Sequence, residues 1–247
     1  MRNMTETVKQ LIIINIIFFV GTQAVGDFAY KFLSLYYPEN PDFQFWQPLS
    51  HMFMHGDLMH IFFNMFALYS FGTTLEQIWG SRKFLFFFIS CGLGAALIHF
   101  GSNYYFFHDS LSTLVANGMA ESEIMKVLSQ GKFDSRWQEI LSPSDFTNFI
   151  GAYTTPAVGA SGAIYGVLVA FAFLFPNAEL AFMFIPVPIK AKYFVPVIVG
   201  LDLFSGVTGF SIFGDGIAHF AHVGGALVGF LMMWYWKKNQ FYSNRWD

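Results

Sequence analysis

Residues 217–236 read IAHFAHVGGALVGFLMMWYW, a run that contains no Asp, Glu, Lys or Arg. A helix that crosses a bilayer needs about 20 predominantly apolar residues, which is the length of this run. His222, Ala226 and Gly229 follow one another at helical spacing, so the two small residues lie below the imidazole on one face. Ionisable side chains inside a membrane are costly and are functional candidates by default. The run therefore predicts a membrane helix with a functional histidine near one end and a face that a second helix can approach closely.

The composition of the whole chain also indicates a membrane protein. Of its 247 residues 55% are hydrophobic and 12% are charged, and the mean hydropathy is +0.47. A soluble domain typically carries about 25% charged residues, and with so few it would expose large apolar patches. The net charge of −3 argues against a nucleic-acid partner. The single cysteine, Cys91, excludes an intramolecular disulfide and is expected to be a packing residue.

Six apolar segments approach the length of a membrane span. They cover about 9–29, 58–77, 82–102, 158–175, 192–209 and 217–236. We therefore expect an all-α membrane protein in which residues 1–247 form a single bundle of six transmembrane helices. The first segment follows basic residues, as a signal peptide would, but no small-x-small cleavage site follows it, so we expect a retained span. Two connections are long, L1 (30–57) and L3 (103–157), and L3 contains a predicted surface helix at Glu121–Gln130.

The positive charges indicate an orientation. With six crossings, nine of the thirteen Lys and Arg residues fall on the side of the two termini and four on the other side. The positive-inside rule then places both termini in the cytoplasm and the long segments L1 and L3 outside. We expect a multi-pass integral protein that lies in the lipid bilayer of a bacterial plasma membrane.

Three polar clusters fall at the predicted external ends of the second, fourth and sixth spans. In the first, His60 and Asn64 are four residues apart and project from one helix face. In the second, Ser161 opens the fourth span among small residues, with Tyr165 one turn deeper. His222 belongs to the third. Each cluster alone has a packing explanation, since small residues and amides are common at contacts between membrane helices.

Taken together and in this order, the three clusters resemble the rhomboid family of intramembrane serine proteases. The motifs are His60-x-x-x-Asn64, Gly159-x-Ser161-Gly162-x-x-x-Gly166 and Ala221-His222-x-Gly224-Gly225-x-x-x-Gly229, and the likeness extends to Phe45-Trp46-Gln47, His51, His55 and Glu76. It covers residues 43–102 and 155–236. Gln47 is a departure, because the family often has Arg after this Trp; the change concerns the anchoring of L1.

The resemblance implies an intramembrane serine endopeptidase. Ser161 would attack the scissile carbonyl, and His222 would accept the hydroxyl proton, as a Ser–His dyad with no acidic third member. His60, Asn64 and the backbone N–H of Ser161 would hold the oxyanion. The substrates would be transmembrane segments of single-span or polytopic membrane proteins, cut near the external face. No cofactor and no metal is implied.

The resemblance also implies supporting residues around this dyad. Tyr165 would stack against the His222 ring and hold it in place. Gly159 and Gly162 flank the nucleophile, and His55 would support the oxyanion side through hydrogen bonds. We expect structural or exposed positions for His51 and His219, and a flexible cap over the site at Gly206–Gly216.

Four other functions compete with this interpretation. The histidines suggest a metalloprotease, but His-Glu-x-x-His is absent. Asp202 and Asp215 suggest an aspartyl intramembrane protease, but the Gly-x-Gly-Asp motif is absent. A polytopic transporter commonly shows repeat symmetry, and none is evident. A proteolytically inactive rhomboid-like chaperone or binding protein would be expected to lack Ser161 or His222.

Overall fold

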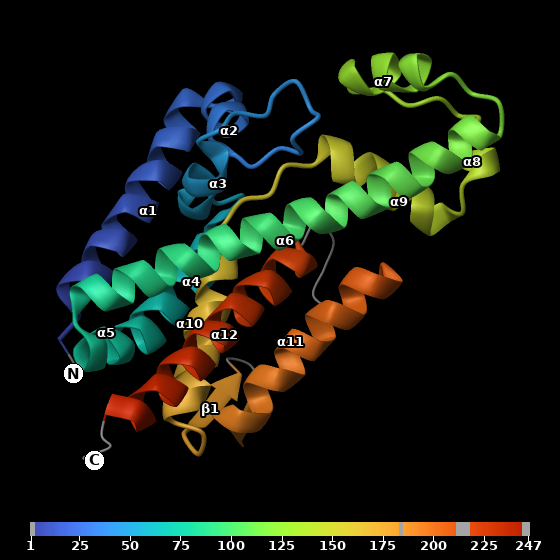
Figure 1. Cartoon of the computed structure of the whole chain (residues 1–247). Helices are drawn as coiled ribbons and strands as arrows, with labels where there is room; N and C mark the ends of the chain where they lie inside the picture. Colours follow the sequence, from blue (N-terminus) through green and yellow to red (C-terminus); the bar gives the residue numbers. More distant parts are fainter. Residues whose placement is uncertain (1–2, 183–184, 211–217, 244–247) are drawn as a thin grey trace.

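The computed structural model describes residues 3–182, 185–210 and 218–243. They form a bundle of helices with one short antiparallel hairpin, so the predicted all-α membrane class is confirmed (Figure 1). The elements are α1 (Glu6–Val25), α2 (Asp27–Leu33), α3 (Gln47–Ser50), η1 (His51–Phe53), α4 (Leu58–Ala67), η2 (Leu68–Gly72), α5 (Thr73–Trp79), α6 (Ser81–Ala116), α7 (Glu121–Ser129), α8 (Trp137–Ile140), α9 (Pro143–Thr154), α10 (Ser161–Leu174), β1 (Glu179–Phe182), β2 (Ile185–Lys190), α11 (Ala191–Thr208) and α12 (His219–Ser243).

Four of the described helical stretches are long and apolar enough to cross a membrane. They are Glu6–Val25, Leu58–Trp79, Ser81–Ala116 and Ala191–Thr208, and the second is α4, η2 and α5 in succession. The helix α10 is apolar but shorter, with 14 residues. Helices thus occupy each of the six predicted segments, while six crossings of a bilayer stay a prediction.

Two glycines with positive φ set helix boundaries near the N-terminal side of the chain. Gly26 has a φ of 75° and ends α1 at Val25, so the first span predicted to reach residue 29 stops earlier and α2 begins in a new direction. Gly80 has a φ of 77° and separates α5 from α6, at the turn expected from Trp79-Gly80-Ser81.

The helix α6 is much longer than the predicted span at 82–102. It continues to Ala116 because no Gly or Pro lies between Gly101 and Gly118, and because Phe107, Leu111 and Leu114 recur at helical spacing and are buried. Its 36 residues measure about 54 Å, which exceeds the roughly 30 Å of hydrocarbon in a bilayer. The first part of L3 is therefore a projecting helix and not a loop.

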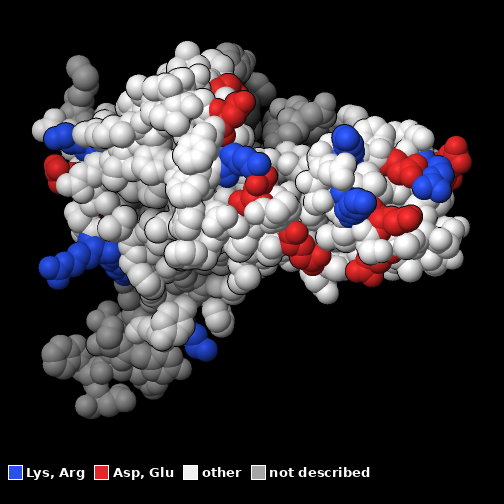
Figure 2. Space-filling view, turned by 90° about the horizontal axis from the view of Figure 1, so that it is seen from above, with Lys and Arg blue, Asp and Glu red and all other residues white. Residues whose placement is uncertain are grey.

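The rest of L3 folds onto this projection. The helices α7, α8 and α9 bury a second apolar core with the end of α6, in which Trp137 and Phe149 are fully buried. The predicted surface helix at Glu121–Gln130 is confirmed as α7. Residues 109–145 carry nine charged side chains, and Figure 2 shows charges gathered on this projecting part of the molecule. The projection is therefore suited to water and not to lipid.

The elements divide between the two ends of the bundle as the charge pattern requires. In Figure 1 the start of α1, the α5–α6 turn, the hairpin and the end of α12 lie at one end. The helices α2, α3, α7, α8 and α9, which come from L1 and L3, lie at the other end. The hairpin replaces the plain Pro-rich connection expected at 176–191.

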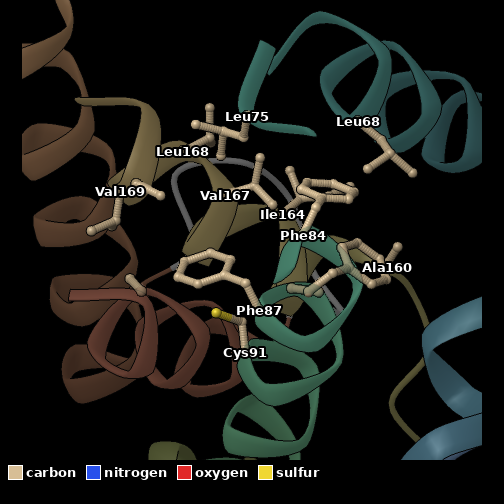
Figure 3. Packing of buried hydrophobic residues seen from close by; sticks show 14 of the residues in the cluster. Leu68, Leu75, Phe84, Phe87, Cys91, Ala160, Ile164, Val167, Leu168 and Val169 are labelled. Atoms are coloured by element: carbon tan, nitrogen blue, oxygen red, sulfur yellow. The ribbon is translucent and has the colours of Figure 1, made fainter. Parts of the chain in front are cut away.

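The helix α10 lies at the centre of the main core. Its side chains Ile164, Val167, Leu168 and Val169 lie in one buried cluster with residues of η2, α5 and α6 (Figure 3). Cys91 of α6 is buried in the same cluster, which confirms its expected packing role. A Cβ built on Gly166 would lie 2.4 Å from the Cys91 Sγ atom, so the two helices already touch.

Glycines bring α10 and α12 into backbone contact. A Cβ built on Gly225 would lie 1.8 Å from the carbonyl oxygen of Gly162, and one on Gly229 would lie 2.7 Å from the Cα of Gly166. No larger residue fits either place without separating the helices. The prediction that α12 presents a face of small residues to the Gly-x-Ser-Gly helix is confirmed.

Glu76 ties the first helix to the second. Its buried carboxylate accepts hydrogen bonds from the Thr5 and Ser81 hydroxyls, both at 2.6 Å, and from the backbone N–H groups of Thr7 and Val8, both at 2.9 Å. Backbone N–H groups in the first turn of a helix have no partner within the helix, so this carboxylate caps α1.

Candidate active site

Ser161 and His222 meet, as the sequence predicted. Ser161 is the first residue of α10 and His222 lies in the first turn of α12, and the Ser161 Oγ atom is 2.8 Å from the His222 Nε2 atom. The contact follows from the glycine seam, the close approach of Gly162 and Gly166 on α10 to Gly225 and Gly229 on α12. This approach lets a serine and an imidazole on facing backbones reach each other.

Tyr165 lies one turn below Ser161 and stacks on His222. The two ring centroids are 4.3 Å apart and the planes differ by 12°, so the stacking implied by the resemblance is present. The stack restricts rotation of the imidazole about its side-chain bonds. The Tyr165 hydroxyl donates a hydrogen bond to Asp202, a residue of α11.

Asp202 corrects the expectation that His222 has no acidic partner. Its Oδ1 atom lies 3.1 Å from the His222 Nδ1 atom and 2.6 Å from the Nδ1 atom of His219. The sequence does carry a signal for it, because an ionisable side chain within a predicted span is a functional candidate. Its place beside His222 depends on how α11 packs, which no motif in the chain encodes. Asp215, the other candidate for an aspartyl pair, lies outside the described residues, as do residues 211–216 of the predicted cap.

The two side chains expected to hold the oxyanion, His60 and Asn64, both lie on α4. Asp57 caps this helix by accepting a hydrogen bond from the His60 backbone N–H at 2.9 Å. A Cβ built on Gly159 would lie 2.7 Å from the His60 Nε2 atom and 3.5 Å from the Ser161 Oγ atom. The glycine thus keeps open the space between the imidazole and the hydroxyl. Asn64 is 6% exposed and lies one turn further along α4.

Backbone hydrogen bonds hold the segment before Ser161 against L1. Leu35 and Ala157 exchange two backbone hydrogen bonds of 2.9 Å, and the Gly159 N–H donates to the His51 carbonyl at 2.9 Å. Gly159 itself has a φ of 122°, a conformation that side chains with a Cβ rarely adopt. The position of Ser161 therefore depends on L1 as well as on α10.

Gln47 anchors L1 in place of the arginine common in the family. It is fully buried; its Oε1 atom accepts from the Tyr36 N–H at 3.2 Å, and its Nε2 atom donates to the carbonyls of Asp42 at 3.0 Å and Lys31 at 3.3 Å. Its backbone carbonyl also lies 2.9 Å from the His51 Nδ1 atom. The amide thus ties together three parts of the loop.

Two other histidines, His51 and His55, lie near the site and are both buried. His51 is buried and bonded to backbone, which confirms the structural position expected for it. His55 makes no hydrogen bond among the described residues; its ring instead packs edge-on against the His60 ring, with centroids 5.0 Å apart. The hydrogen bonds expected from the His55 ring are therefore absent from the part of the chain that the structure describes, and the ring contacts His60 instead. Burial lowers the pKa of His55 to about 3 and that of His51 to about 4, so both rings are neutral at pH 7.

A small pocket opens beside Ser161. Ser161 forms part of its wall, and most of the lining is glycine and alanine, including Gly92, Ala95, Gly162 and Ala221. Within the described part of the chain, no group of three or more His, Cys, Asp and Glu side chains is placed to hold a metal ion.

This chain is similar in sequence to several known proteins that are named as rhomboids. Rhomboid protein 1, mitochondrial, of Saccharomyces cerevisiae is 26% identical over 186 residues, which are 75% of this chain and 40% of that protein. Presenilin-associated rhomboid-like protein, mitochondrial, of Homo sapiens is 32% identical over 139 residues, 53% of this chain and 35% of that protein. Rhomboid protease AarA of Providencia stuartii is 26% identical over 196 residues, 75% of this chain and 53% of that protein.

The chain thus spans between 35% and 53% of the length of these relatives. The profile of the Rhomboid domain matches residues 42–122 and 138–239, which include Ser161, His222, His60 and Asp202. The chain belongs to the rhomboid family.

Proposed function

We propose that this protein is an intramembrane serine endopeptidase with Ser161 as nucleophile and His222 as general base. The observation that carries the proposal is the 2.8 Å approach of the Ser161 Oγ atom to the His222 Nε2 atom. A serine hydroxyl is a weak nucleophile, and an adjacent base within hydrogen-bond reach is the usual means of activating it. An inactive binding protein would have no need to hold the two groups at this distance.

The reaction follows from this geometry in two stages. Ser161 Oγ attacks the scissile carbonyl carbon while its proton moves to His222 Nε2. The tetrahedral intermediate then expels the amine, which takes the proton from Nε2, and an acyl-enzyme remains. Water attacks the ester carbonyl, gives one proton to Nε2, and the second intermediate releases the new carboxyl group and restores the Ser161 hydroxyl.

The negative charge of each intermediate needs donors on the opposite side of the carbonyl. We assign this role to the His60 ring, the Asn64 amide and the backbone N–H of Ser161, because the start of α4 faces Ser161 across Gly159. Donors fixed in a water-poor site are each worth about 3 kcal/mol in the transition state.

The substrates we propose are transmembrane segments of other membrane proteins, cut near the external face. His60, Ser161 and His222 lie at the first turns of α4, α10 and α12, and these turns lie toward the end of the bundle that bears L1 and L3. Water can reach that end, which hydrolysis requires. A helical substrate hides its amides in backbone hydrogen bonds, so segments that unwind easily should be preferred. The pocket lined by glycine and alanine favours a small side chain beside the scissile bond.

The membrane itself is a separate proposal. The names of the yeast and human relatives place those proteins in mitochondria, whereas AarA comes from a bacterium. The relatives named for mitochondria favour a mitochondrial membrane over the bacterial plasma membrane expected from the sequence. Fractionation of the native cells distinguishes the two.

The test is cleavage of a model single-span protein in liposomes, together with labelling by a fluorophosphonate probe that reacts with activated serines. We expect Ser161→Ala and His222→Ala to abolish both, while membrane insertion and thermal stability stay close to those of the unchanged protein. Cleavage that persists in Ser161→Ala would overturn the assignment. A folded, unchanged protein that neither cleaves nor reacts would favour the binding-protein or transporter alternatives.

A further inference from the structure

Asp202 is a buried carboxylate in an apolar helix, with hydrogen-bond donors from two other helices around it. It is 1% exposed and lies on α11, within the stretch Ala191–Thr208 that is apolar enough to span a membrane. An isolated ionised carboxylate in such a place would be very unfavourable, so its partners are essential to it. Those partners are the Tyr165 hydroxyl on one oxygen atom, and the Nδ1 atoms of His219 and His222 on the other.

The bonds to the carboxylate determine which nitrogen of His222 carries the proton. An ionised carboxylate can only accept hydrogen bonds, so the Nδ1 atom that faces it at 3.1 Å must be the protonated one. In a neutral imidazole the Nε2 atom is then bare and can accept the proton of Ser161, whose Oγ atom is 2.8 Å away. This is the tautomer that a general base needs. The carboxylate also stabilises the imidazolium that forms once the proton has moved.

We propose that Asp202 is the positioning residue of His222, so that Ser161, His222 and Asp202 act as one hydrogen-bonded chain across α10, α12 and α11. The inference rests on the proposed serine protease function and names a third member of its machinery. His219 and Tyr165 serve the chain indirectly, because they bond to two other acceptor sites of the carboxylate and keep its Oδ1 atom against His222.

A purely structural role is the alternative to be excluded. Asp202 connects α11 to α10 and α12 by hydrogen bonds. A connection of this kind would stabilise the fold whichever nitrogen of His222 carries the proton. The two roles differ in what they change. A tie affects stability and substrate binding, whereas a positioning residue affects the proton on His222 and kcat.

Asp202→Asn is the informative change, because it keeps the shape of the side chain and removes its charge. An amide can face His222 with either its oxygen or its nitrogen, so it no longer selects one tautomer. We expect kcat for a model single-span substrate to fall about 10- to 100-fold, with KM within about threefold of the unchanged protein. Ser205→Ala is the matched control. Ser205 is equally buried one turn further along α11, and its change should leave kcat unaltered.

The second readout does not need activity. In full-length protein labelled with ¹⁵N-histidine, the His222 ring, assigned by its loss in His222→Ala, should show a proton on Nδ1 and a bare Nε2. Asp202→Asn should lose this preference. If Asp202→Asn does not fold, the tautomer in the unchanged protein decides the matter alone.

Two outcomes would overturn the proposal. The first is a proton on the Nε2 atom of His222 in the unchanged protein. The second is a folded Asp202→Asn protein with unaltered kcat and tautomer, whether or not its KM and melting temperature change. If the unchanged protein neither cleaves nor reacts with fluorophosphonate, the protease function fails, and the ¹⁵N measurement still tests whether Asp202 positions His222.

Discussion

Replacing Gly225 by Ala should disable the site without touching any of its polar groups. A Cβ built on Gly225 would lie 1.8 Å from the Gly162 carbonyl oxygen, whereas carbon and oxygen atoms approach to about 3.3 Å. The helices α10 and α12 must therefore separate by about 1.5 Å at this level. Gly162 directly follows Ser161, and Gly225 lies one turn from His222. The 2.8 Å contact between Ser161 and His222 should open beyond hydrogen-bond range.

The expected loss is large. Misplacement of reacting groups by about 1 Å can lower a rate by about 100-fold, so Gly225→Ala should lose at least that much in kcat. Overpacking of a well-packed core also costs about 1–3 kcal/mol, so the melting temperature should fall. The assay is the rate of fluorophosphonate labelling of Ser161, with thermal unfolding measured on the same preparation.

Two further glycines make the test specific. In Gly229→Ala the added Cβ would lie 2.7 Å from the Gly166 Cα atom, so this change should have a smaller effect than Gly225→Ala. Gly101→Ala, on α6, places its Cβ in open space and should leave both the rate and the stability unchanged. Equal labelling rates for Gly225→Ala and Gly101→Ala would refute the argument that the glycine seam sets the Ser161–His222 distance.

Three other changes test separate parts of the structure. Glu76→Gln should lower the free energy of unfolding by about 1–3 kcal/mol, because an amide leaves a backbone N–H of α1 without an acceptor. In thermal unfolding, Glu6→Gln at an exposed position is the control, and equal melting temperatures for the two variants would contradict the capping role. Asn64→Ala should reduce kcat by about 100- to 1,000-fold without abolishing it, because two oxyanion donors remain; an unaltered kcat would remove Asn64 from the site. Gln47→Ala should release L1 from its anchor, seen as faster proteolysis within residues 30–57, and unchanged cleavage there would refute its anchoring role.

The membrane class was predictable because it depends on local sequence, and the Ser161–His222 pair was predictable from the resemblance of the motifs to the rhomboid family. Apolar runs of spanning length identify helices regardless of their neighbours, and small residues below His222 predict a close helix partner. The length of α6 was not predictable from hydropathy, because the hydropathy of Ser81–Ala116 falls after residue 102 while its helical periodicity continues. Hydropathy indicates where lipid ends, and a helix can go on in water when its apolar face has a partner such as α9.

The contact of His55 and the anchoring by Gln47 could also not be predicted without the tertiary structure. A histidine near His60 can contact it through a hydrogen bond or through its ring, and only the packing of L1 shows that the His55 ring meets the His60 ring edge-on. Gln47 replaces a charged residue with a neutral one, and only the course of the loop shows that three backbone groups converge on its amide.

By itself, the sequence determined that this is an all-α membrane protein, because apolar runs of spanning length identify membrane helices. The likeness of its three motifs to the rhomboid family indicated that Ser161, His222, His60 and Asn64 belong to one site. Tertiary structure alone decided what stands behind His222. Asp202 is twenty residues away on another helix, and its distance from the imidazole depends on the rotation and depth at which α11 packs against α12. Those two quantities come from the summed contacts of the whole bundle, and no local pattern encodes them.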